Sequence, residues 1–106
     1  METVSADYVE NMDLSDENTH LVDVLSEDHF EKKHLPGAVN IPLDQVATRA
    51  LDEFDKDEEI VVYCKDEECS ASPKAAEKLE KLGFENVKDF EGGIKEWRNS
   101  GHEVES

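Results

Sequence analysis

The sequence has no long hydrophobic run, which excludes one class of protein at once. None of its apolar stretches approaches the roughly 20 residues that a membrane-spanning helix needs. The opening residues, METVSADYVE, also lack the basic and apolar segments of a secretory signal. We therefore expect a cytoplasmic protein that does not contact a membrane.

Cysteine is scarce as well. Two cysteines, Cys64 and Cys69, cannot build a disulfide scaffold, and free thiols are expected in a reducing cytosol. They also cannot complete a thiolate-rich zinc site, and the four histidines are scattered without the paired spacing of metal ligands. We expect no metal and no cofactor.

Positive charge is the third deficit. Eleven Lys and Arg face 28 Asp and Glu, which leaves a net charge of −17. Nucleic acid is excluded as a partner, because its binding depends on basic groups that neutralise phosphate. The acidic residues are spread along the whole chain, as expected of a very soluble domain. The same pattern suits a protein of concentrated salt, where the Debye length falls to about 3 Å at 1 M and self-repulsion is screened.

What is present is a regular alternation of short strand and helix patterns. The length of 106 residues fits a single domain over 1–106, and a hydrophobic content of 37% allows a small core. The alternation predicts an α/β fold, with a small central parallel sheet of about four to five strands and helices on both faces. Strands are expected over 20–25, 37–42, 58–64 and 86–90, and helices from Ser5 and over 26–34, 43–54, 70–84 and 92–101.

Cys64 ends the strongest strand pattern, EEIVVYC, directly before a loop and a helix. Ligands of open α/β sheets bind outside the carboxyl ends of the strands. Loop amides and a helix N-terminus would stabilise a thiolate there, so Cys64 could be a nucleophile. It could equally be a small buried residue at the end of a strand. A third interpretation pairs it with Cys69 as a redox couple, in which Cys69 is the resolving thiol.

Three segments carry a family resemblance. The segment 21–46 contains Asp-Val followed by His-Leu-Pro-Gly-Ala-Val-Asn-Ile-Pro, 60–64 reads IVVYC, and 83–97 reads GFENVKDFEGGIKEW. In this order they resemble the signatures of the rhodanese-like, or sulfurtransferase, family. The resemblance covers nearly the whole chain and implies the rhodanese-like fold with Cys64 as its catalytic residue.

The resemblance also implies a mechanism. The Cys64 thiolate would take a sulfane sulfur from thiosulfate or a persulfide and pass it on from a Cys64 persulfide. The acceptor would be cyanide or a thiol, including that of a sulfur-relay protein, and the domain would act as a monomer. Cys69 would be an auxiliary thiol, and Asp23 and His34 would be structural residues near the site. The backbone amides expected to cradle the persulfide are those of Lys65, Asp66, Glu67, Glu68, Cys69 and Ser70.

The active loop departs from the family pattern. It has one cation, Lys65, against the three carboxylates of Asp66 to Glu68, and it lacks the usual arginine. These carboxylates are expected to raise the thiol pKa and to repel thiosulfate. Leu25 also stands where an arginine is usual. The alternative function is therefore a non-catalytic module of this fold that binds a partner or senses sulfur or redox state. The phosphatases that share the fold are disfavoured, since no arginine lies between Cys64 and Lys74 to bind a phosphoryl group.

Overall fold

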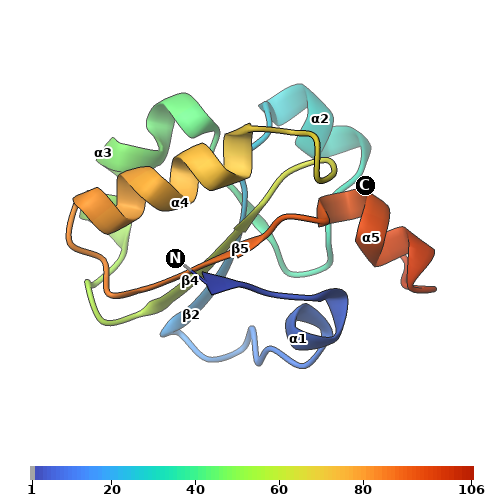
Figure 1. The fold of residues 1–106 in the computed structure, drawn as a ribbon, viewed down its shortest axis with the longest axis horizontal. Coiled ribbons are helices and arrows are strands. Elements are labelled where there is room, and N and C mark those ends of the chain that lie inside the picture. The colour runs from blue at the N-terminus through green and yellow to red at the C-terminus, as the bar shows by residue number, and fades with distance from the viewer. Residues whose placement is uncertain (1) are drawn as a thin grey trace.

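The protein is described by a computed structural model that covers residues 2–106, arranged around one parallel sheet (Figure 1). The strand order is β1-β5-β4-β2-β3, and every neighbouring pair is parallel. The predicted α/β class with a small parallel sheet is therefore confirmed. The strands are β1 (Glu2–Thr3), β2 (Thr19–Asp23), β3 (Val39–Asn40), β4 (Glu59–Tyr63) and β5 (Asn86–Phe90).

Helices cover both faces of the sheet, as predicted (Figure 1). One buried cluster joins β2 and β4 to residues of α3 and α4, and a second joins the other face of the sheet to α1 and α5. The helices are α1 (Ala6–Glu10), α2 (Glu27–Lys32), α3 (Val46–Glu53), α4 (Ala71–Lys81) and α5 (Gly93–Asn99), with a 3-10 turn η1 (Leu43–Gln45) before α3. Of these described helices, none is long and apolar enough to cross a membrane.

The sequence of β4 explains why it lies in the middle of the sheet. Ile60 and Val62 pack in the cluster beneath α3 and α4, whereas Val61 and Tyr63 pack in the cluster on the opposite face. This is the two-residue periodicity of a strand that is buried on both sides. Cys64 follows the strand directly, so the carboxyl edge of the sheet is where its sulfur lies.

Serine caps begin the two helices that were expected from Ser5 and over 26–34. The hydroxyl oxygen of Ser5 accepts a hydrogen bond from the amide of Tyr8, and that of Ser26 accepts one from the amide of His29. Gly83 follows α4 with a φ of 98°, the left-handed conformation that favours glycine after a helix. The helix patterns therefore carried enough information to locate both kinds of boundary.

Two elements differ from expectation. β1 was not predicted, because its two residues pair only with β5 at the edge of the sheet and show no periodicity of their own. The strand expected over 37–42 is reduced to Val39–Asn40, because Gly37 turns the chain with a φ of 82° and Pro42 precedes η1. Neither difference moves the carboxyl edge of β4.

Candidate active site

The backbone around Cys64 is held by the start of α5. The amide of Ile94 donates to the carbonyl of Cys64 at 3.1 Å, and the amide of Lys95 donates to the carbonyl of Lys65 at 3.0 Å. Gly93 permits this contact, since it has a φ of 58° and a Cβ there would collide with the carbonyl oxygen of Cys64. The closing Gly-Gly motif thus fixes the strand end that carries the cysteine.

The sulfur of Cys64 is buried and lies in a disulfide with Cys69. The two Cα atoms are 6.4 Å apart, within the usual range for a disulfide. Cys64 Sγ also lies 3.5 Å from the carbonyl oxygen of Cys69 and 3.5 Å from the hydroxyl oxygen of Ser72. Ser72 is fully buried in the first turn of α4. The sequence reasoning did not single it out, because only the fold brings this helix position against the sulfur.

The side chain of Asp66 organises the loop between the two cysteines. Its Oδ1 accepts hydrogen bonds from the amides of Glu68, at 3.1 Å, and Cys69, at 3.2 Å. The carbonyl of Asp66 also accepts from the amide of Cys69 at 3.1 Å. Two of the six amides expected to cradle a persulfide are therefore already engaged by Asp66. Within residues 2–106, the amides of Lys65, Asp66, Glu67 and Ser70 make no hydrogen bond, and their role stays a prediction.

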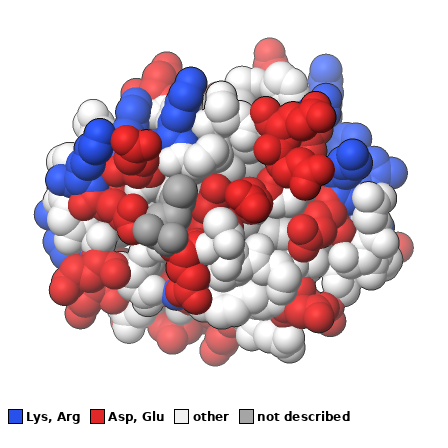
Figure 2. Space-filling model, viewed as in Figure 1, with Lys and Arg blue, Asp and Glu red and all other residues white. Residues whose placement is uncertain are grey.

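A pocket of about 530 Å³ lies beside the loop, between α2 and α5. Five of the eleven cations of the chain line it, and Asp66 is the only carboxylate among the lining residues. No ion pair in the described part of the chain involves any of these five cations. Figure 2 shows cationic side chains at the edge of the molecule where Figure 1 places α2 and α5. The lining consists of Leu25, His29, Lys32, Lys33, Lys65, Asp66, Ile94, Lys95, Arg98 and Asn99.

The other two loop carboxylates do not face this pocket. Glu67 lines an adjoining hollow with Gly92 and Glu96, which shares Lys95 and Asn99 with the pocket, and the exposed Glu68 lines neither. The sequence reasoning treated all three carboxylates as one repulsive group, because their directions cannot be read from adjacent positions. It also missed the cations of α2 and α5, which lie far from Cys64 along the chain.

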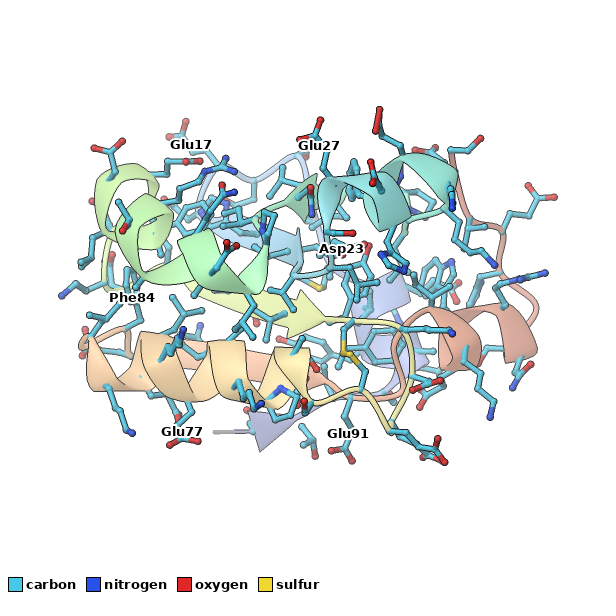
Figure 3. All side chains as sticks on the ribbon, turned by 90° about the horizontal axis from the view of Figure 1, so that it is seen from above. Glu17, Asp23, Glu27, Glu77, Phe84 and Glu91 are labelled. Carbon is cyan, nitrogen blue, oxygen red and sulfur yellow. A yellow bond between two sulfur atoms is a disulfide. The ribbon has the colours of Figure 1, made fainter. Side chains whose placement is uncertain are left out.

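Asp23 lies behind the site, at the end of β2 that Figure 3 shows opposite the Phe84 end of the sheet. It is buried, its Oδ1 accepts a hydrogen bond from the amide of Leu25 at 2.8 Å, and burial raises its pKa. His34 follows α2. Its Nδ1 is 2.8 Å from the carbonyl oxygen of Phe30, and its ring stacks on the ring of Phe30. Both side chains contact backbone or ring atoms of their own neighbourhood, whereas the sulfur of Cys64 contacts Cys69 and Ser72. Within residues 2–106, no cluster of His, Cys, Asp and Glu is placed to hold a metal ion.

A parallel sheet with a cysteine at the carboxyl end of its central strand, held by a Gly-Gly helix start, defines a class of small α/β domains. The model of the rhodanese-like domain family matches residues 5–100. The chain therefore belongs to the rhodanese-like domain family, as the three sequence segments indicated.

Named proteins similar to this chain include a thiosulfate sulfurtransferase. The thiosulfate sulfurtransferase PspE of Escherichia coli is 33% identical over 73% of this chain and 72% of its own length. The HTH-type transcriptional regulator Rv0324 of Mycobacterium tuberculosis is 39% identical over 80% of this chain but only 37% of its own length. The crystal structure of the BH2092 protein from Bacillus halodurans is 30% identical, has a TM-score of 0.86, and matches 99% of this chain and 77% of that one. The chain spans less than half the length of the first curated relatives it matches.

Proposed function

We propose that this domain is a sulfurtransferase in which Cys64 carries sulfur as a persulfide. The proposal takes the disulfide as the oxidised form of the site and the dithiol as the form that reacts. After reduction, the Cys64 thiolate would lie at the N-terminus of α4, within reach of the Ser72 hydroxyl as a hydrogen-bond donor. Both features favour the ionised thiol.

The first step with thiosulfate transfers one sulfur atom. The thiolate attacks the outer sulfur, the sulfur–sulfur bond of thiosulfate breaks with its electron pair, and sulfite leaves. A Cys64 persulfide remains, and a thiol or cyanide then attacks its outer sulfur and regenerates the thiolate. The acceptor could be a small molecule or the thiol of a sulfur-relay protein. Each half of the cycle is a displacement at sulfur and needs no cofactor.

The cations of the pocket indicate which class of donor the domain would use. Five unpaired cations and one carboxylate, in a chain of net charge −17, create a local region where an anion is attracted. Lys65 and Asp66, the two residues after Cys64, line the pocket, whereas Cys64 itself is buried and does not, so an anion would bind beside the loop and reach the sulfur through movement of the loop. This revises the expectation that the acidic loop repels thiosulfate. An anionic sulfane-sulfur compound is the donor class that we propose.

The test uses two variants that each retain a single thiol. Cys69→Ser keeps the nucleophile and Cys64→Ser is its matched control. We expect thiosulfate or a polysulfide to add one sulfur atom to the intact mass of Cys69→Ser, and cyanide to remove it. Thiosulfate should also yield about one sulfite per protein. No added sulfur on Cys69→Ser with any donor, or equal addition to both variants, would contradict the proposed function.

A further inference from the structure

We propose that Cys69 attacks the Cys64 persulfide and expels its outer sulfur as sulfide, which gives the domain a persulfide-reducing activity besides sulfur transfer. This inference rests on the proposed function, because it begins from the loaded Cys64. It assigns a chemical role to Cys69 and to the disulfide, which sulfur transfer alone does not use.

The geometry identifies the atom that Cys69 attacks. A persulfide has an inner sulfur, which is Cys64 Sγ, and an outer sulfur, which came from the donor. In the structure Cys69 Sγ is bonded to Cys64 Sγ, so the loop brings the second thiol to the inner sulfur. Attack there releases the outer sulfur, whereas attack at the outer sulfur would only move the persulfide to Cys69. Sulfide release is therefore the outcome that this loop favours.

The loop is preorganised for this attack. The three hydrogen bonds to Asp66, one from the amide of Glu68 and two from that of Cys69, fold residues 66–69 into a turn that directs Cys69 back toward the strand end. Cys69 is only partly buried, so it can meet a reductant from outside. A thiol held in this way acts at an effective concentration on the order of millimolar or more. External thiols well below that concentration would compete poorly for the loaded cysteine.

The step balances without an added oxidant. The Cys69 thiol gives its proton to the outer sulfur and forms a bond to Cys64 Sγ, the bond from Sγ to the outer sulfur breaks, and hydrosulfide leaves with the electron pair. The sulfane sulfur is reduced to sulfide while the two cysteine thiols are oxidised to the disulfide. A dithiol reductant then exchanges with the disulfide and restores both thiols. The net reaction is reduction of a sulfane sulfur by a dithiol.

The experiment follows a single turnover of the reduced wild-type protein. Thiosulfate is added, sulfite release is recorded as the measure of loading, and free sulfide and intact mass are then followed with no thiol present. We expect about one sulfide for each sulfite, and a final mass two hydrogens below that of the dithiol. The rate constant of sulfide release should not change when the protein concentration changes about tenfold, since the attack is intramolecular. Cys69→Ser should release sulfite, keep the added sulfur and yield sulfide only after dithiothreitol is added.

The outcomes separate the two proposals. If wild-type protein releases sulfite but keeps its added sulfur as long as Cys69→Ser does, the sulfide-releasing activity is wrong and sulfur transfer stands. If wild-type sulfide release scales with protein concentration, the attack is intermolecular and the role of Cys69 is wrong. If neither protein releases sulfite or gains sulfur from any donor, the proposed function fails and this inference fails with it. The wild-type readouts decide the matter even if Cys69→Ser does not fold.

Discussion

Among single residues, Asp89 is unusual because its carboxylate is buried. It lies in β5 with 1% of its surface exposed, and both of its carboxylate oxygens are buried without a hydrogen-bond partner in the described part of the chain. Burial raises its pKa above the ordinary value for an aspartate, and the nearby Ser72 hydroxyl lowers the pKa by less. A raised folded-state pKa means that the native state binds the proton more tightly than the unfolded state does. The contribution of Asp89 to stability is therefore greatest below the pKa of the unfolded chain, and it is lost as the pH rises through the pKa of the folded state.

Asp89→Asn removes the charge and nearly preserves the shape. We expect its free energy of unfolding at neutral pH to exceed that of wild type by about 1 kcal/mol, since the substitution removes a charge that is buried without a partner. The gain should shrink as pH falls and should vanish below about pH 4, where the wild-type carboxyl is protonated in the unfolded chain as well. Urea unfolding at several pH values measures this, with the exposed loop change Asp57→Asn as control. A gain that is the same at every pH would show that the charge of Asp89 is not its cause.

At the scale of elements, the contact between α5 and the end of β4 depends on one glycine. Gly93 combines a φ of 58° with a position where a Cβ would meet the carbonyl groups of Cys64 and Lys65. Gly101 has a φ of 90° but open space around it. The pair therefore separates the cost of the backbone conformation, about 1–2 kcal/mol for a left-handed residue with a side chain, from the cost of the collision.

We expect Gly93→Ala to destabilise the protein by clearly more than Gly101→Ala, which should lose about 1–2 kcal/mol. Loading of Cys64 should also fall in Gly93→Ala at temperatures where it remains folded, since the strand end must shift. Thermal unfolding and the sulfite assay on both variants provide the comparison. Equal losses of stability together with normal loading would mean that the α5 contact does not position Cys64.

The elements also show which features of the fold and the site could be predicted from the sequence. The β4 pattern depends on neighbouring residues and placed Cys64 correctly at the end of a central strand, and the serines likewise located the starts of α1 and α2. The Cys64–Cys69 pairing remained open, because spacing alone does not direct two side chains toward one another. Ser72 and the cations of α2 and α5 reach the site only through tertiary packing, so local patterns could not reveal them. The effect of the acidic loop on the donor stays a prediction, because the directions of its three carboxylates also depend on tertiary packing.

For the whole molecule, charge is unevenly distributed. The net charge of −17 implies self-repulsion across the surface, whereas five cations gather at the pocket. Figure 2 shows cationic side chains at that edge and a second group at the opposite edge of the same face. Salt screens both effects, since the Debye length falls from about 8 Å at 0.15 M to about 3 Å at 1 M. Screening relieves repulsion among the carboxylates but weakens attraction of an anionic donor to the pocket. Stability and donor capture should therefore respond to salt in opposite directions.

We expect the unfolding temperature to rise between low and molar sodium chloride, while the thiosulfate concentration needed for half-maximal loading also rises. At low salt, Arg98→Gln should raise that concentration by about fivefold, the equivalent of about 1 kcal/mol for one charge close to the anion. Lys78→Gln, which removes the same charge from the exposed side of α4, should leave it nearly unchanged. In molar salt the two variants should converge. If Arg98→Gln and Lys78→Gln weaken loading equally, long-range charge rather than the pocket attracts the donor, and the pocket is not its binding site.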